Sequence, residues 1–293
     1  MKIKESLGMK VFRFINGIIL TALAIACVYP MYHVIMASFS DGYSLLGHSG
    51  ALITPLNFNL DGYEKLFEYP ILLKSYGNTL FICVVQLVLN VILTSFAAYA
   101  LTRKELHIRR YVMLFILFTM YFNGGMVPTY MLIRDLGLLN SLWSIILPSA
   151  LTTYNLIVLR TAFAAVPESL YESARLDGAG HFQILFKIYL PLTKASLAVV
   201  VLYYLVAAWS SWFSASLYLD DREKYPLQLL LREILIENDA GEMSAGVSDS
   251  EKQAVSETLK YSAIVISTIP ILCVYPFLQK YFAKGVMIGA VKG

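Results

Sequence analysis

Long apolar stretches dominate the chain and alternate with shorter polar segments. Six of them contain no Asp, Glu, Lys or Arg: 14–39, 75–102, 111–133, 142–159, 195–219 and 261–279. A helix needs roughly 20 predominantly apolar residues to cross the hydrocarbon core of a bilayer. The pattern therefore predicts an all-α integral membrane protein with six transmembrane helices.

The composition agrees with a membrane protein and excludes several other classes. Of the 293 residues, 58% are hydrophobic and only 15% are charged, whereas a soluble domain carries about 25% charged residues. The net charge of +3 is too small to indicate a nucleic-acid partner. The three cysteines lie in apolar runs without a C-x-x-C spacing, so neither a metal site nor a disulfide framework is predicted.

The first apolar stretch has to be distinguished from a cleaved signal peptide. It follows basic residues, as a signal core does, and Ala24 to Cys27 approach a lipoprotein cleavage site. The apolar run, however, continues past Pro30 to Ala37 and exceeds the 7–15 residues of a signal core. We therefore interpret 14–39 as a retained helix.

The distribution of Lys and Arg predicts the orientation. If the N-terminus is cytoplasmic, the inside segments hold 15 basic and five acidic residues, and the outside segments hold eight basic and 15 acidic residues. The opposite orientation would violate the positive-inside rule in every sizeable loop. We therefore predict a multi-pass membrane protein with both termini cytoplasmic. Of the two long external segments, 40–74 is expected to be irregular, and 220–260 is polar and acidic.

A polar segment, 165–191, lies between the fourth and fifth predicted spans, on the cytoplasmic side. Pro167 suits the first position of a helix, which Gly178 is expected to end. A second short helix is expected from His181 until Pro191, which cannot continue it. The segment is too polar to span the membrane. It is either an ordinary structured loop or a docking element for another protein.

Within this segment the pattern Glu172-Ser173-Ala174-x-x-Asp177-Gly178-Ala179, with Leu190-Pro191 after it, resembles the "EAA" loop of binding-protein-dependent ABC importers. Ser173 stands where the motif has its first alanine. The resemblance implies a cytoplasmic coupling helix seated in a cleft of an ATP-binding subunit. The implied contact residues are Glu172, Ser173, Ala174, Arg175, Asp177, Gly178 and Ala179.

Two further segments carry a resemblance. The C-terminal run 281–293 is similar to the tail of the smaller, six-helix permease of maltose-type importers, which implies ATPase contacts by Lys284, Gly289 and Lys292. The segments 122–130 and 136–140 resemble the branch that handles complex oligosaccharides, including aldouronates and alginate.

Taken together, the resemblance implies a type I ABC importer permease fold in a bacterial cell (inner) membrane. It also implies a role as permease subunit for a carbohydrate of the oligosaccharide class. Its domains would be a cytoplasmic segment 1–13, a permease domain 14–284 that contains the coupling loop 165–191, and a tail 285–293. The implied partners are a second permease, two ATP-binding subunits, an extracytoplasmic solute-binding protein and membrane lipid.

The chain itself is not expected to be an enzyme or to hold a cofactor. It lacks a G-x-x-x-x-G-K-[ST] phosphate loop, so ATP and Mg²⁺ are expected on the partner ATPase subunits. A permease for a non-sugar solute remains an alternative. A secondary carrier is a weaker one, because carriers usually place ionisable residues inside the membrane.

A sugar crossing the membrane needs a polar and aromatic lining. The candidates within the predicted spans are Gln86, Asn90, Asn123, Trp209 and Trp212. Amides also hold helices together and Trp also marks membrane interfaces, so each has an ordinary structural alternative. Because no span contains Lys or Arg, we expect a neutral or mildly acidic sugar, or an acidic one whose charge is handled elsewhere.

Overall fold

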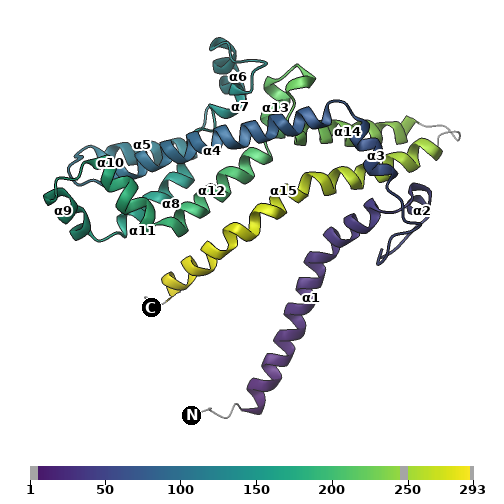
Figure 1. The fold of residues 1–293 in the computed structure, drawn as a ribbon, viewed down its shortest axis with the longest axis horizontal. Helices are drawn as coiled ribbons and strands as arrows, with labels where there is room; N and C mark the ends of the chain where they lie inside the picture. Colours follow the sequence, from purple (N-terminus) through teal and green to yellow (C-terminus); the bar gives the residue numbers. More distant parts are fainter. Residues whose placement is uncertain (1–5, 245–249, 291–293) are drawn as a thin grey trace. The chain divides into compact units, whose positions relative to one another are not determined.

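The computed structural model describes residues 6–244 and 250–290, with side chains described at 6–236, 253–274 and 276. Over these residues the chain is built from helices and turns and contains no strand. It packs as two units. Unit 1 comprises Met1–Tyr69 and Glu233–Thr268, and unit 2 comprises Pro70–Arg232 and Ile269–Gly293. Figure 1 shows the fold.

Unit 1 is organised around the first part of α15 (Ser250–Ala290). The long α1 (Leu7–Ser38) is followed by two short helices, α2 (Gly42–Leu46) and α3 (Asp61–Glu68). A Cβ atom at Gly42 would collide with the backbone of Ala254, and one at Gly62 would lie 2.8 Å from the carbonyl oxygen of Thr258. The sequence predicted an irregular segment at 40–74, and this was wrong because both glycines let helices approach α15 closely.

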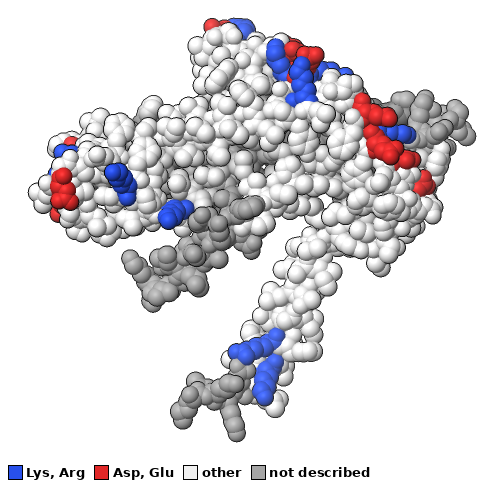
Figure 2. Space-filling model, viewed as in Figure 1, with Lys and Arg blue, Asp and Glu red and all other residues white. Residues whose placement is uncertain are grey.

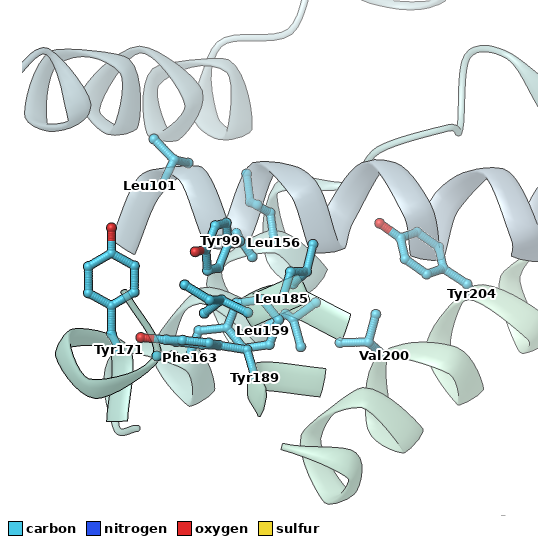
Figure 3. Packing of buried hydrophobic residues seen from close by; sticks show 13 residues of the cluster. Tyr99, Leu101, Leu156, Leu159, Phe163, Tyr171, Leu185, Tyr189, Val200 and Tyr204 are labelled. Atoms are coloured by element: carbon cyan, nitrogen blue, oxygen red, sulfur yellow. The ribbon is translucent and has the colours of Figure 1, made fainter. Parts of the chain in front are cut away.

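Unit 2 is built on α4 (Leu72–Thr102), which packs along α8 (Thr153–Ala164) and α12 (Lys194–Trp209) (Figure 1). Its hydrophobic cluster includes Leu156, Leu159, Phe163 and Leu185, all at most 1% exposed (Figure 3). Close packing of apolar side chains from three helices stabilises this end of the unit.

The third predicted span is interrupted where the sequence predicted it. The helix α5 (Arg109–Tyr121) ends before Asn123, and α6 (Met126–Asp135) begins after Gly125 at an angle of 111°. Gly125 has a φ of 89°, and the Asn123 side-chain oxygen accepts its backbone N–H at 2.8 Å. The amide oxygen thus stabilises a turn that a side chain at 125 would strain.

The fourth predicted span was expected as one helix, and this was wrong. The structure has a short α7 (Trp143–Ile146) and then a turn before α8. Pro148 lies in that turn and lacks the N–H that would continue α7, and its ring would clash with a preceding carbonyl group. The fifth predicted span also divides, into α12 and α13 (Trp212–Tyr218), at Ser210 and Ser211.

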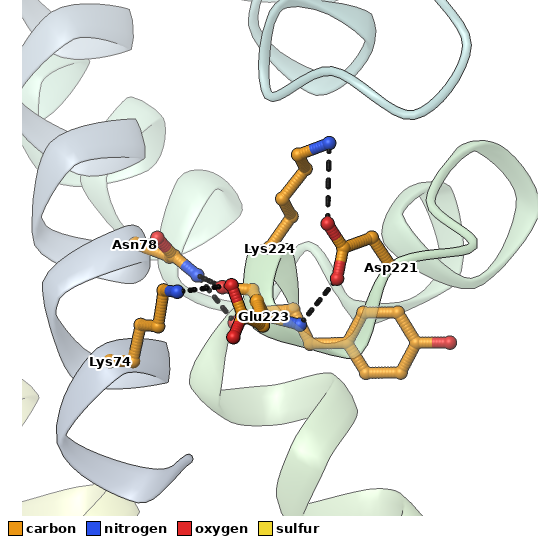
Figure 4. Close-up of polar contacts among 6 residues, drawn as sticks. Lys74, Asn78, Asp221, Glu223 and Lys224 are labelled. Carbon is orange, nitrogen blue, oxygen red and sulfur yellow. Dashed lines mark hydrogen bonds and ion pairs between the residues drawn. The ribbon is translucent and has the colours of Figure 1, made fainter.

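The polar segment after α13 is largely helical over its described residues. A 3-10 turn, η2 (Arg222–Lys224), leads into α14 (Leu227–Ser244). Figure 4 shows how this turn is tied to α4: Lys74 pairs with Glu223 at 2.5 Å, and Asn78 donates to the Glu223 carbonyl oxygen at 2.8 Å. Asp221 pairs with Lys224 at 3.4 Å.

Within the described part of the chain, three helices are each long and apolar enough to cross a membrane: α1, α4 and the stretch 253–274 of α15. Two bent helix pairs meet the same criteria together, α5 with α6 and 181–192 with α12, the second pair bending by 88°. The view in Figure 2 shows wide surfaces without charge on the long helices of unit 2, with Lys, Arg, Asp and Glu gathered at helix ends and loops. Such a distribution is typical of a protein embedded in lipid.

Candidate functional site

The segment between α8 and α12 contains the predicted docking helix, α9 (Glu168–Leu176). Its end is fixed by two backbone hydrogen bonds, from Gly178 N–H to the Arg175 carbonyl oxygen at 3.1 Å and from Ala179 N–H to the Ala174 carbonyl oxygen at 2.9 Å. This pair is the Schellman motif, which requires a left-handed residue after the helix. Gly178 meets that requirement with a φ of 78°. The predicted helix end is therefore confirmed.

One face of α9 is anchored in the core of unit 2. Tyr171 and Ala174 are buried in the cluster, and Ala179 packs against it from the turn. Contact between the residues on either side of a Schellman turn commonly accompanies this motif. Ala174 thus fixes α9 to its own protein instead of presenting a side chain outward.

A buried arginine holds α9 to the end of α4. The guanidinium carbon of Arg103 lies 4.3 Å from the ring centroid of Tyr171 and 4.8 Å from those of Tyr99 and Tyr189. Its Nη2 donates to the Tyr189 hydroxyl at 2.6 Å, and Arg103 is only 8% exposed. Figure 3 shows the three tyrosines arriving from different elements. We call Arg103 and these three tyrosines the Arg103 cage. Cation–π contacts are stronger when the cation is desolvated, as Arg103 is here.

Polar contacts surround the Arg103 cage. Tyr171 donates to Glu105 Oε1 at 2.8 Å, and Lys104 pairs with Glu168 at 3.0 Å. The backbone N–H of Glu105 itself, followed by the Tyr171 hydroxyl, lowers the pKa of the Glu105 carboxyl. Burial and the neighbouring Glu105 raise the pKa of Tyr171. At neutral pH the carboxylate thus stays ionised and the phenol stays protonated, so the hydrogen bond persists.

The opposite face of α9 is exposed. Glu172, Ser173, Arg175, Asp177 and Gly178 all lie on this surface. A Cβ atom at Gly178 would meet no other atom within 4 Å. We call this group the exposed α9 face. It offers two carboxylates and one guanidinium, which make strong charge-assisted hydrogen bonds, around a position with no side chain.

The second half of the segment differs from the prediction. After α10 (His181–Ile184) the chain forms a π-helical turn at Leu185–Tyr189 and continues through α11 (Leu190–Leu192). Pro191 was expected to end the helix, and the helix does end one residue later, at Leu192, where the chain bends by 88° into α12. The π turn before the proline was not predicted. A π turn widens the backbone just before the proline, which relieves the clash between its ring and the preceding turn.

The residues proposed for a sugar path lie in different surroundings. Gln86 and Asn90 are buried on α4, and neither Gln86 Oε1 nor the Asn90 amide group has a hydrogen-bond partner among the described residues. Trp209 is buried and Trp212 is half-buried beneath the guanidinium of Arg232, 3.6 Å from the ring centroid. Asn123 lies in the α5–α6 turn. These five side chains thus lie on four elements: α4, the α5–α6 turn, α12 and α13.

The predicted tail contacts cannot be placed. Lys284 and Gly289 lie in the last turns of α15, beyond the side chains that the structure describes, and Lys292 lies outside the described residues. Over the part of the chain that is described, no group of three or more His, Cys, Asp or Glu side chains could hold a metal ion.

Sequence reasoning missed the role of Arg103, which it counted only as one charge of the 103–110 segment. The available signal was an arginine directly after an apolar span, four residues beyond Tyr99. Tyr171 and Tyr189 lie far along the chain, and nothing in their spacing predicted that they would enclose the same guanidinium.

Proteins of known role resemble this chain over nearly its full length. The polygalacturonan/rhamnogalacturonan transport system permease protein YtcP of Bacillus subtilis (strain 168) is 42% identical and aligns over 94% of this chain and 96% of its own length. Protein LplC of the same organism is 38% identical over 97% and 96% of the two chains. The structure also matches a chain of a bacterial ABC transporter involved in the import of the acidic polysaccharide alginate. That match has a TM-score of 0.86 and 32% identity, and covers 96% of this chain and 100% of the other.

The alginate transporter match includes the whole helical architecture described above, which therefore has the type I ABC permease fold. Residues 91–288 match the family of the binding-protein-dependent transport system inner membrane component. That range contains α9, the Arg103 cage and most of unit 2. The chain belongs to the family of binding-protein-dependent transport system inner membrane components.

Proposed function

We propose that this chain is one permease subunit of an ATP-driven importer and forms, with a second permease, the membrane pathway for an oligosaccharide. An extracytoplasmic binding protein would deliver the sugar, and two ATP-binding subunits would supply the energy. The family assignment and the permease relatives support this proposal. In a second solved structure with this fold, at 15% identity and a TM-score of 0.56, an alginate ABC transporter is in complex with a periplasmic protein bound to alginate pentasaccharide.

The observation that carries the proposal is the two-sided build of α9. One face is anchored through Tyr171 and Ala174, and the other leaves Glu172, Arg175 and Asp177 exposed. A rigid, polar, projecting helix suits docking into a cleft, because little flexibility is lost when it binds. Movement of a docked α9 would pass through the Arg103 cage to the end of α4.

We propose six spans with both termini cytoplasmic. The three long helices would each cross once, and the remaining spans would be broken at the α5–α6, α7–α8 and α12–α13 turns. Broken helices at membrane depth are tolerated where the freed backbone groups are covered by protein or line a water-filled cavity.

Cysteine accessibility tests this topology. In a background without Cys27, Cys83 and Cys273, a membrane-impermeant thiol reagent is expected to label Ser49→Cys in intact cells and to leave Ser169→Cys unlabelled until the cells are opened. Both positions are exposed on the protein, so burial does not explain protection. Labelling of Ser169→Cys in intact cells would reverse the proposed orientation.

The substrate class follows from the relatives and from one local contact. YtcP is a polygalacturonan/rhamnogalacturonan transport system permease, and the matched solved structure is a transporter involved in the import of alginate. Arg232 lies over Trp212 at the proposed outer end of the pathway, beyond α13. A guanidinium beside an aromatic ring can bind a carboxylate and stack on a sugar at once. We therefore propose an oligosaccharide that carries uronic acids.

Reconstitution of the permease pair with its ATPase and binding protein tests both points. ATP-dependent uptake is expected only from the complete set, and Arg232→Gln is expected to reduce uptake of oligogalacturonate about tenfold, since hydrogen bonds to charged groups contribute about 1.5–3 kcal/mol. Arg222→Gln, a control in the neighbouring turn, should leave uptake unchanged. Uptake by this chain alone without ATP would refute the importer. An equal effect of Arg232→Gln on neutral and acidic sugars would refute only the uronate contact.

A further inference from the structure

Three helices of unit 2 reach a common cavity of about 490 Å³ at the end that carries α9. Its wall includes the end of α4, the start of α5 and the last turns of α8. Five basic residues line it: Arg103, Lys104, Arg109, Arg110 and Arg160. We call it the basic cavity. Of the described residues that line it, Glu168 is the single acid, and Lys104 already pairs with that carboxylate at 3.0 Å.

The end of α4 explains why these arginines converge. The last carbonyl groups of a helix have no partner within the helix. Arg160 Nε lies 3.4 Å from the Leu101 carbonyl oxygen, and Arg109 Nη1 lies 3.5 Å from that of Thr102. Each guanidinium has five N–H donors, so these long contacts leave most donors for something else.

Capping alone does not account for the cavity. Arg103 is 8% exposed, lines the wall, and its Nε and Nη1 have no hydrogen-bond partner among the described residues. A buried, incompletely paired guanidinium is costly, and an anion in the cavity would reduce that cost. The arrangement therefore fits a negatively charged ligand.

Part of the remaining wall of the basic cavity is apolar and continues onto the outside of α5. Met113 and Leu114 line it, one turn along from Arg109 and Arg110. Leu114 is 55% exposed and Phe115 is 68% exposed. A site that begins with guanidinium groups and continues over an exposed apolar helix face matches a charged headgroup with attached acyl chains.

We propose that the basic cavity binds the phosphate headgroup of an anionic membrane lipid, whose acyl chains lie along α5. The lipid is assigned to the cytoplasmic leaflet because of the topology proposed above. Binding of the lipid to the basic cavity does not depend on that topology. The phosphate of a bound lipid would offset the positive charge of Arg103 and the basic residues beside it. It would thereby link the membrane to the element that anchors α9.

Native mass spectrometry of the purified full-length chain in mild detergent tests the proposal. Phosphatidylglycerol is expected to bind at least tenfold more tightly than phosphatidylcholine with the same acyl chains. A Lys or Arg near an anionic lipid surface contributes about fivefold in affinity, so the double variant Arg109→Gln/Arg160→Gln should weaken phosphatidylglycerol binding about 25-fold. Lys187→Gln is the control. It removes a positive charge from the π-helical turn, outside the basic cavity, and should leave lipid binding unchanged.

Because Arg109 and Arg160 also cap α4, Arg110→Gln is the second variant. Arg110 lines the cavity but is exposed at the start of α5, and its replacement should weaken binding about fivefold without lowering thermal stability in lipid-free detergent. Equal phosphatidylglycerol binding by Arg110→Gln, the double variant and the unchanged chain would overturn the proposal. Displacement of the lipid by millimolar inorganic phosphate would assign the site to free phosphate and refute the lipid. Unaltered lipid binding with lost ATPase co-purification would assign the arginines to a partner protein.

Discussion

Replacing Gly178 with leucine is expected to abolish sugar-stimulated ATP hydrolysis and transport while leaving membrane insertion intact. Two physical effects act together. Gly178 has a φ of 78°, which other L residues adopt at a cost of about 1–2 kcal/mol. It also lies in the exposed α9 face with open space above its Cα atom, so a leucine would project toward whatever docks there. The measurement is co-purification of the ATPase subunit with the variant, alongside transport.

Matched variants separate these two effects. Asparagine tolerates the left-handed conformation better than leucine and is smaller, so Gly178→Asn should retain part of the ATPase binding. Gly180 has an ordinary φ, and a Cβ there meets nothing within 4 Å, so Gly180→Ala controls for replacing a nearby glycine. If Gly178→Leu keeps the ATPase bound and transports normally, α9 is a structural loop and not a docking helix.

A charge variant tests the same surface without changing the backbone. Glu172→Gln keeps the size of an exposed side chain on α9 and removes its charge. If the carboxylate is buried in the interface, the loss should be about 2–5 kcal/mol of binding, and far less if it lies at the rim. Because the φ of residue 172 is unaffected, any loss here reports contact with the partner.

The hydropathy of the chain was sufficient to predict a membrane protein but not the shape of its helices. Charge-free runs of about 20 residues predict the length of a membrane-crossing helix, and three of the predicted runs correspond to the continuous helices α1, α4 and α15. The break at Asn123–Gly125 was predicted from the turn residues themselves. The break after Ile146 was missed, because a single Pro148 within an apolar run does not show whether the helix will kink or stop.

The helix α9 was predictable for a different reason. Its end depends on Gly178 and on hydrogen bonds within five residues, so the local sequence contains the whole motif. What anchors the helix depends on contacts between residues far apart in the chain. Tyr99, Arg103, Tyr171 and Tyr189 meet only after α4 and the 165–191 segment have packed together, and no local pattern predicts that contact.

The glycines of unit 1 show the same limit. Asp41-Gly42 and Asp61-Gly62 look like turns, since both dipeptides favour turns in isolation. In the structure each glycine instead removes a side chain at a close approach to α15. The aspartates act at helix starts: Asp41 accepts the Ser44 N–H at 3.0 Å, and Asp61 is the first residue of α3. A glycine can serve through its conformational freedom, as in a turn, or through its lack of a side chain, as at a close contact. The sequence alone does not show which, because that depends on packing.

Replacing Arg103 with alanine is expected to loosen α9 without unfolding the spans. The change removes three cation–π contacts and the hydrogen bond to Tyr189, and leaves space among the rings. A desolvated cation–π contact contributes about 2 kcal/mol and a hydrogen bond to a charged group about 1.5–3 kcal/mol. These contributions overlap, so we expect a loss of about 3 kcal/mol in the local stability of α9.

Hydrogen exchange measures this loss directly, because amides in α9 exchange through local opening. A loss of about 3 kcal/mol corresponds to opening more than a hundredfold more often, so the amides of residues 168–176 should exchange faster by that factor. Amides in the middle of α4 should keep their protection. Arg103→Lys retains the positive charge but lacks the planar guanidinium that stacks on rings. Exchange in its α9 should be faster than in the unchanged protein and slower than in Arg103→Ala.

Two controls make the result specific to the Arg103 cage. Arg134→Ala removes an exposed arginine that pairs with Asp135 on α6, and should leave exchange in α9 unchanged. Tyr171→Phe keeps the ring under Arg103 and removes the hydroxyl that donates to the Glu105 carboxylate, so its effect should be about 1.5 kcal/mol, smaller than that of Arg103→Ala. If Arg103→Ala leaves exchange in α9 unchanged, the burial of Tyr171 and Ala174 suffices to hold the helix, and the guanidinium does not transmit motion between α9 and α4.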